Sequence, residues 1–202
     1  MHASNILILF LSKSLSGRDK YQYNNIRFAF DIPFWKYYLI YYSCFSAGNL
    51  DQLFEGTGYI TIGYYKSEED SLGTSVKNMT ARLAEISEIN ASSHVLDLGC
   101  GKGIPALDIA MAHGCSVVGV DLAEKLVEIG RRAFEKYRQE KPDLKAEFHA
   151  ASYFELPEAV MSQRFTHVLM QTSLFYVLDR IDEVFAQVSK LLKPGGVFVA
   201  AD

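Results

Sequence analysis

Apolar residues follow two alternating patterns along the chain from Thr74 onwards. Short apolar runs indicate five buried strands, at residues 94–98, 116–121, 146–152, 166–171 and 197–201. Between the runs, apolar residues recur at helical spacing and indicate helices, at residues 74–86, 104–113, 126–137 and 181–191. Strands that alternate with helices build a parallel sheet covered on both faces. The pattern therefore predicts an α/β doubly wound domain with a mostly parallel sheet.

The first fifty residues show no such alternation and are crowded with aromatic side chains. We expect one or two helical segments there, packed on the main body. This gives an N-terminal helical aromatic cap or lid (residues 1–56) and a core domain (residues 57–202). The most apolar stretch, residues 28–45, is interrupted by two charges and a proline, whereas a membrane span needs about 20 mostly apolar residues. No integral membrane span is expected.

Charge and cysteine content narrow the classes of function. The 202 residues carry 20 Lys and Arg against 24 Asp and Glu, a net charge of −4. Nucleic acid is not expected as a partner, because phosphate backbones bind to basic surfaces.

Cys44, Cys100 and Cys115 form neither a C-x-x-C pair nor a zinc spacing. Such cysteines are typical of free thiols in a reducing compartment, so we expect a cytoplasmic protein without a metal site.

Three glycines at alternate positions follow the first predicted strand. The run Asp97-Leu98-Gly99-Cys100-Gly101-Lys102-Gly103 leads from that strand into a helix. Glycines there let the backbone turn sharply and let a ligand come close. The next strand ends in Asp121, whose carboxylate can accept hydrogen bonds from both hydroxyls of a ribose. Because the carboxyl ends of parallel strands share one edge of the sheet, the two features predict a nucleoside site.

The spacing of the glycines separates two families of nucleoside-binding proteins. A dinucleotide fingerprint, G-x-G-x-x-G, would place its third glycine at position 104, where the chain has isoleucine. An NAD-dependent oxidoreductase is therefore the weakest alternative. Glycines at 99, 101 and 103, with an acid two residues before the first, resemble motif I of the class I S-adenosylmethionine-dependent methyltransferases, (D/E)-x-G-x-G-x-G. The resemblance extends over residues 57–202 by the order and spacing of elements, including the turn at 193–196 ahead of the last strand.

This resemblance implies a Rossmann-like methyltransferase sheet with S-adenosylmethionine as cofactor. Asp121 matches the ribose-binding acid of the family. Ser152 stands where the family usually has an acid that reaches the adenine amino group, which implies weaker adenine binding or a backbone contact in its place. The resemblance places the following residues at the cofactor: Asp97, Gly99, Gly101, Gly103, Asp121, Leu122, Ser152, Tyr153 and Gln171.

For the methyl acceptor, the resemblance points to aromatic residues in two loops. The segment 59–65 resembles one that closes over the methyl donor in many small-molecule methyltransferases, which implies that Tyr64 and Tyr65 reach the pocket. Phe175 and Tyr176 follow the fourth predicted strand and are implied to lie near the acceptor. Tyr64 and Tyr176 are the candidate catalytic residues, as groups that orient a polar acceptor; packing of the cap on the core is the alternative role. The implied acceptor is a small molecule, either an amine, a phenol or quinone, or a lipid.

The enzyme hypothesis has one alternative. Methyltransferases of this family continue past the fifth strand with a helix and two more strands, whereas this chain stops at Asp202. The resemblance thus implies a truncated chain whose fifth strand is an exposed apolar edge, open to pairing in a homo-oligomer. One hypothesis is a methyltransferase that works by in-line displacement and needs no histidine base. The other is a non-catalytic S-adenosylmethionine-binding or interaction module, inactive through the missing part and Ser152.

Overall fold

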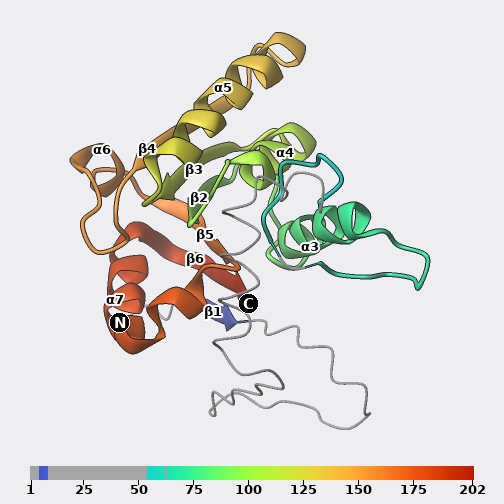
Figure 1. The fold of residues 1–202 in the computed structure, drawn as a ribbon. Coiled ribbons are helices and arrows are strands. Elements are labelled where there is room, and N and C mark those ends of the chain that lie inside the picture. The colour runs from blue at the N-terminus through green and yellow to red at the C-terminus, as the bar shows by residue number, and fades with distance from the viewer. Residues whose placement is uncertain (1–4, 9–53, 62) are drawn as a thin grey trace, which may run out of the picture.

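The computed structural model describes residues 5–8, 54–61 and 63–202, which form one parallel sheet with helices on both faces (Figure 1). The strands are β1 (Asn5–Ile8), β2 (His94–Leu98), β3 (Ser116–Asp121), β4 (Lys145–Ala150), β5 (Phe165–Gln171) and β6 (Leu192–Ala201). They lie in the order β1-β6-β5-β2-β3-β4, and every neighbouring pair is parallel. This confirms the doubly wound α/β sheet expected from the alternation of strands and helices.

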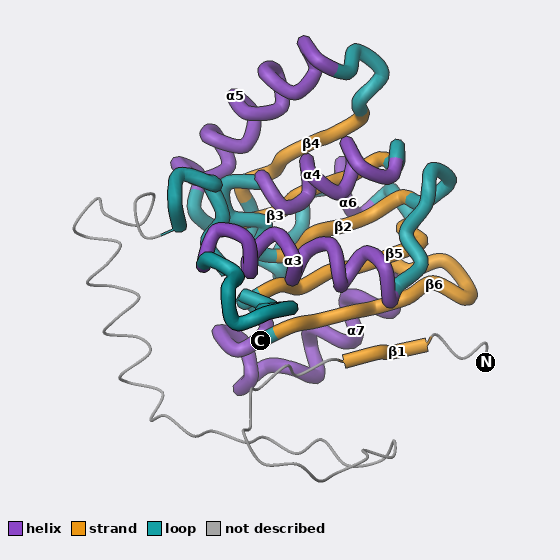
Figure 2. The backbone as a smooth tube through the Cα atoms, turned by 90° about the vertical axis from the view of Figure 1, so that its right-hand side faces the viewer, coloured by secondary structure: helices purple, strands orange, loops and turns teal. Residues whose placement is uncertain are grey.

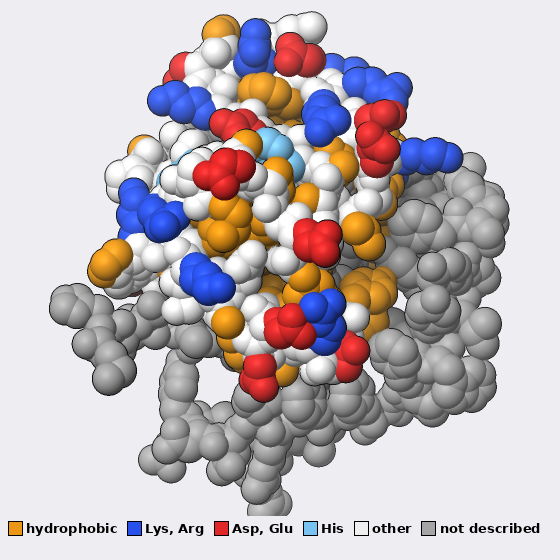
Figure 3. All heavy atoms as spheres, turned by 90° about the vertical axis from the view of Figure 1, so that its left-hand side faces the viewer, with side chains coloured by type: hydrophobic (Ala, Val, Ile, Leu, Met, Phe, Trp, Pro, Cys, Tyr) orange, Lys and Arg blue, Asp and Glu red, His pale blue; other side chains and the backbone are white. Residues whose placement is uncertain are grey.

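The helices divide between the two faces of the sheet (Figure 2). One face carries α3 (Leu72–Ile86), α4 (Ile104–His113) and α5 (Glu124–Glu140), and the other carries α6 (Glu158–Met161), the 3-10 helix η1 (Leu174–Arg180) and α7 (Ile181–Leu191). None of the helices in the described ranges is both long and apolar enough to cross a bilayer. On the surface drawn in Figure 3, acidic and basic side chains are interspersed and neither sign forms a continuous patch.

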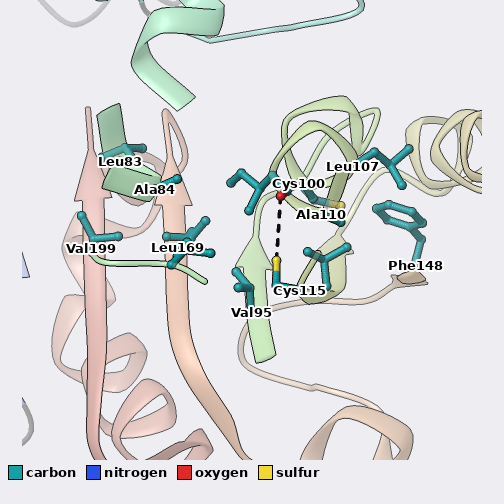
Figure 4. Close-up of a cluster of buried hydrophobic side chains, with 14 of the residues drawn as sticks. Leu83, Ala84, Val95, Cys100, Leu107, Ala110, Cys115, Phe148, Leu169 and Val199 are labelled. Carbon is teal, nitrogen blue, oxygen red and sulfur yellow. Dashed lines mark hydrogen bonds between the residues drawn. The ribbon is translucent and has the colours of Figure 1, made fainter. Parts of the chain in front are cut away.

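Successive residues of each strand face opposite ways and so contribute to two separate cores. The core under α3 and α4 is drawn in Figure 4 and includes, from the strands, Val95, Val117, Phe148, Leu169 and Val199. The core under α7 includes Leu96, Val118, Val168 and Phe198. Because helices cover both faces, consecutive residues of the central strands are all buried. This is why the sequence shows continuous apolar runs there.

The N-terminal segment contributes a strand rather than a helix where it is described. β1 pairs with the outer edge of β6, in a register from Asn5 opposite Val197 to Ile8 opposite Ala200. The expectation of an exposed edge at the fifth predicted strand is therefore wrong, because the backbone groups of that edge are paired within the chain. Of the expected helical aromatic cap, residues 1–4 and 9–53, which include Cys44, lie outside the described residues. Cys100 and Cys115 are both buried free thiols.

Two elements differ in detail from their sequence patterns. The buried positions of α5 are Val127 and Gly130, whereas Ile129, expected on the buried stripe, is 39% exposed. A Cβ at Gly130 would lie 3.1 Å from the carbonyl oxygen of Lys102, so the missing side chain lets the helix approach the sheet edge closely. β6 begins at Leu192, five residues earlier than expected, because the turn at 193–196 forms a bulge within its pairing to β5.

Candidate functional site

The carboxyl ends of β2, β3 and β5 meet where the chain reverses its direction of winding across the sheet. β2 lies between β3 and β5, and in such sheets ligands bind beyond the strand ends at this point. A pocket opens there between the glycine loop (residues 99–103) and the 58–61 segment. Its lining residues are Gly58, Ile60, Thr61, Asp97, Gly99, Cys100, Gly101, Lys102, Pro105 and Gln171.

The three glycines of the loop all have left-handed backbone angles, with φ of +85° at Gly99, +54° at Gly101 and +69° at Gly103. Side chains rarely adopt this region, so the path of the loop requires glycine. A Cβ at Gly99 would lie 2.4 Å from both Ser173 Cβ and Tyr153 Oη, whereas a Cβ at Gly101 would meet nothing within 4 Å. Gly99 thus permits close packing of the protein, and Gly101 leaves open space on the pocket side.

Phe148 of β4 supports the glycine loop from below. A Cβ at Gly103 would lie 2.4 Å from Phe148 Cε1, and a Cβ at Gly119 would lie 2.6 Å from Phe148 Cδ1. The ring, 5% exposed, therefore occupies space that two glycines leave free. The third glycine of the motif is thus explained by packing against a side chain on a distant strand, which the sequence pattern alone did not indicate.

Asp121 connects the glycine loop to the start of α5. Its Oδ2 accepts a hydrogen bond from the Gly101 amide at 2.9 Å, and its Oδ1 accepts one from the Ala123 amide at 2.8 Å. These two bonds hold the glycine loop and the turn before α5 together, whereas the N-cap of α5, Ala123, has no side-chain cap. Each carboxylate oxygen accepts about two hydrogen bonds, so both oxygens keep acceptor capacity for a ligand.

Asp97, at the pocket wall, is a buried carboxyl group with only 5% of its surface exposed. Burial, and to a lesser extent the negative charge of Asp121, raises the pKa of Asp97 to about 7. A carboxyl group of this kind changes its charge near neutral pH, and a cationic group placed beside it stabilises the ionised form.

This pKa predicts a pH dependence of stability. The folded chain holds the Asp97 proton more tightly than the unfolded chain, in which the pKa is about 3.9. The stabilisation is therefore complete below about pH 4 and is lost as the pH rises through about 7. Urea unfolding of wild type and Asp97→Asn between pH 5 and 8 should show a shallower loss of stability in the variant. The difference should be on the order of 2–4 kcal/mol, and parallel curves for the two proteins would contradict the assignment.

Gln171, the last residue of β5, lines the pocket and carries an unpaired amide donor. Its Oε1 accepts a hydrogen bond from Thr80 Oγ1 of α3 at 3.0 Å, which fixes the amide group. Its Nε2 is buried and has no hydrogen-bond partner in the described structure. A buried polar group without a partner costs free energy, so a ligand acceptor at this point would be favourable.

Five of the predicted cofactor residues are not among those that line this pocket: Gly103, Asp121, Leu122, Ser152 and Tyr153. Ser152 Oγ accepts a hydrogen bond from the Phe154 amide at 3.2 Å, within its own turn. Tyr153 packs with the core under α7, hydrogen-bonds Ser173 and has its pKa raised, first by burial. Leu122 directly follows Asp121 and is 75% exposed.

The predicted acceptor residues lie outside the pocket lining as well. Tyr64 packs on the core under α3 and its amide donates to the Ser75 carbonyl oxygen at 2.8 Å, while Tyr65 is exposed. The rings of Phe175 and Tyr176 are tilted by 36° to one another with centroids 4.0 Å apart at the start of η1, and Tyr176 is 40% exposed. Their roles toward an acceptor stay predictions.

Two features of the site were missed in the sequence. The expected covering segment does reach the pocket, but through Gly58, Ile60 and Thr61 rather than its two later tyrosines. The other is Asp202, which follows β6. Its Oδ1 accepts a hydrogen bond from the Phe175 amide at 3.3 Å, and its Oδ2 is buried without a partner in the described structure. Burial raises the pKa of the Asp202 carboxyl group to about 7. Its only sequence signal was its position after a strand.

Comparison with known proteins is consistent with this geometry. A family model described as a methyltransferase domain matches residues 95–196. The chain is 34% identical over 140 residues to the 27-O-demethylrifamycin SV methyltransferase of Amycolatopsis mediterranei, covering 69% of this chain and 49% of the relative. It is 31% identical over 162 residues to the sterol 4-C-methyltransferase strm-1 of Caenorhabditis elegans, covering 80% and 46%.

A solved structure titled as the [4+2]-cyclase SpnF matches with a TM-score of 0.66 at 23% identity, covering 75% of this chain and 54% of that one. This likeness concerns the fold. The chain spans about half the length of the curated relatives that it matches. With the family model matched over half of the chain and the glycine loop and strand order in place, this chain belongs to the class I S-adenosylmethionine-dependent methyltransferases.

Proposed function

We propose that this chain binds S-adenosylmethionine at the pocket between the glycine loop and the 58–61 segment, and transfers its methyl group to a small molecule. The observation that carries the proposal is a set of groups at the carboxyl ends of the strands: Gly101 and Gln171 line the pocket, and Asp121 is hydrogen-bonded to the Gly101 amide beside it. Open space at Gly101, a free donor on Gln171 and spare acceptor capacity on Asp121 lie at neighbouring strand ends. These are the groups that a nucleoside with a charged amino-acid tail requires.

Each part of the cofactor has a candidate partner in the chain. The Asp121 carboxylate would accept hydrogen bonds from the ribose hydroxyls. Gln171 Nε2 would donate to the carboxylate of the methionine part, and the Asp97 carboxylate would attract its amino group. Gly101 would let the ligand contact the backbone of the loop. Ser152 has no acid to offer the adenine amino group, so that contact would fall to the backbone near 152–153.

When bound, S-adenosylmethionine supplies a methyl group already activated by a positive sulfur. The tasks left to the chain are to align the acceptor with this group and to exclude water. Alignment of this kind accounts for about 7–11 kcal/mol in well-oriented reactions. A general base is required only where the acceptor must lose its proton early in the reaction.

The acceptor is proposed to be a small amphipathic or apolar molecule. One relative is named for methylation of a rifamycin oxygen and another for methylation of a sterol carbon. The net charge of −4 and the interspersed surface charges of Figure 3 disfavour nucleic acid. Exposed aromatic groups beyond the strand ends, Tyr65 and Tyr176, suit a phenol, a lipid or an amine.

Tyr64 and Tyr176 are proposed to orient a polar acceptor through their hydroxyls. The substitutions Tyr64→Phe and Tyr176→Phe should then lower kcat by about 2- to 10-fold, the effect of one hydrogen bond. The measurement is turnover with an acceptor found by screening phenols, amines and sterols. If both variants turn over like wild type, the two rings serve only to pack the loops.

The test of the function has two stages. Calorimetric titration with S-adenosylmethionine and S-adenosylhomocysteine measures binding, and transfer of a labelled methyl group to the acceptor panel measures catalysis. A folded chain that binds neither compound would refute the proposal.

A second candidate, a non-catalytic S-adenosylmethionine-binding module, is favoured by one observation. Ser152 replaces an acid at the adenine position and its hydroxyl is engaged in its own turn. The fold of this chain is also shared with a protein titled as a cyclase, and a fold does not determine a reaction. Binding without methyl transfer to any acceptor would support this second candidate.

A further inference from the structure

We propose that Tyr59 is a positioning residue for the S-adenosylmethionine pocket, because its hydroxyl fastens the 58–61 segment to α4. The inference rests on the proposed function, since it concerns the same pocket. Tyr59 does not line the pocket itself, but its neighbours Gly58 and Ile60 do. Its side chain points the other way, into the protein, and only 2% of the residue is exposed.

The Tyr59 hydroxyl is bound to a carboxylate shared with a second tyrosine. Its Oη donates a hydrogen bond of 2.7 Å to Asp108 Oδ2, and Tyr137 Oη donates one of 2.8 Å to Asp108 Oδ1. Burial and the Asp108 charge raise the pKa of both phenols, so both keep their protons at neutral pH. Asp108 lies one turn along α4, the helix that begins directly after the glycine loop. The segment on one side of the pocket is therefore fastened to the helix that carries the other side.

The segment has a second anchor two residues later. Thr61 and Thr172 hydroxyls lie 2.8 Å apart, and Thr172 has a φ of +56°, a left-handed conformation uncommon for a residue with a branched side chain. Gly58, with φ of +77°, lets the segment lie against Ile104, since a Cβ there would be 2.9 Å from Ile104 Cγ1. With Thr61 held at one end and Gly58 packed at the other, the Tyr59 hydrogen bond sets the position of the residues between them.

Tyr137 provides a matched control for the experiment. The substitutions Tyr59→Phe and Tyr137→Phe each remove one phenol hydroxyl from the same Asp108 carboxylate. A purely structural contribution would make the two variants alike. Tyr137 lies on α5 and is not among the residues that line the pocket. Of the two tyrosines, only Tyr59 connects Asp108 to the 58–61 segment.

The probe is S-adenosylhomocysteine, titrated calorimetrically into wild type and both variants. We expect Tyr59→Phe to raise Kd about three- to tenfold, as the loss of one net hydrogen bond implies, and Tyr137→Phe to leave Kd within about twofold. Hydrogen–deuterium exchange of the free proteins over residues 57–61 should be faster in Tyr59→Phe alone. Thermal unfolding midpoints should fall by similar amounts in the two variants.

The outcomes separate this inference from the proposed function. If wild type does not bind the probe, the proposed function fails and so does the role of Tyr59 in binding. If wild type binds and Tyr59→Phe binds equally well, or both variants weaken binding equally, the positioning role is overturned while the proposed function stands. Unchanged exchange over 57–61 in Tyr59→Phe would overturn the anchoring of the segment.

Discussion

Replacing Asp121 by alanine is expected to abolish detectable binding of S-adenosylhomocysteine. The substitution would remove the acceptor for both ribose hydroxyls, and hydrogen bonds to a charged group contribute about 1.5–3 kcal/mol each. Two such bonds correspond to a loss of more than about 100-fold in affinity. The same carboxylate holds the Gly101 and Ala123 amides, so the glycine loop would also lose its link to α5. Calorimetric titration, with a thermal melt to establish folding, measures the effect.

Asp70 provides the control for this substitution. Its Oδ2 also accepts from two backbone amides, those of Lys66 at 2.7 Å and Ser67 at 3.3 Å, in a loop away from the pocket. The variant Asp70→Ala should therefore lose a similar local anchor and keep its affinity. Asp121→Asn should give an intermediate result, because it keeps one acceptor oxygen. Equal affinity of wild type and Asp121→Ala would show that Asp121 only holds the glycine loop to the turn before α5.

The second large effect is expected from Gly101→Asn. Asparagine tolerates the left-handed φ of +54° better than most residues, and nothing in the protein lies within 4 Å of the new Cβ. The chain should therefore fold, with the new side chain in the space where the cofactor is proposed to approach. Filling a packed site costs about 1–3 kcal/mol, or about 10- to 100-fold in affinity.

Two other glycines separate the possible causes of that loss. Gly195 has a φ of +79° and equally open surroundings, but lies in the bulge at the amino end of β6. Gly195→Asn should bind S-adenosylhomocysteine like wild type. Gly99→Asn should instead lower the unfolding midpoint, because its Cβ would collide with Ser173 and Tyr153. Normal binding by a folded Gly101→Asn protein would argue against the pocket as the cofactor site.

The sequence patterns were most informative where burial and periodicity agree. β2 and β3 were predicted to the residue, because both their faces are buried and few residue types fit. The apolar stripe predicted for α5 is shifted from the face that is buried in the structure. This is because Gly130 lies where the helix contacts the sheet most closely, and an apolar pattern does not include glycine. Ile60 and Thr61 of the predicted covering segment line the pocket, together with Gly58 just before it, whereas Tyr64 and Tyr65 do not. Closure of the segment over the methyl donor stays a prediction.

By itself, the sequence determined the order of strands β2 to β6 and of helices α3, α4, α5 and α7, and the family to which the chain belongs. These follow from local rules: apolar period, glycine conformation and an acid at a strand end. Only the tertiary structure decided which side chains from distant parts of the chain are in contact. The fit of Phe148 beneath two glycines, the pairing of β1 with β6 and the Tyr59–Asp108–Tyr137 contacts join residues far apart in the chain. Such contacts depend on packing between elements, which leaves no periodic signal in the sequence.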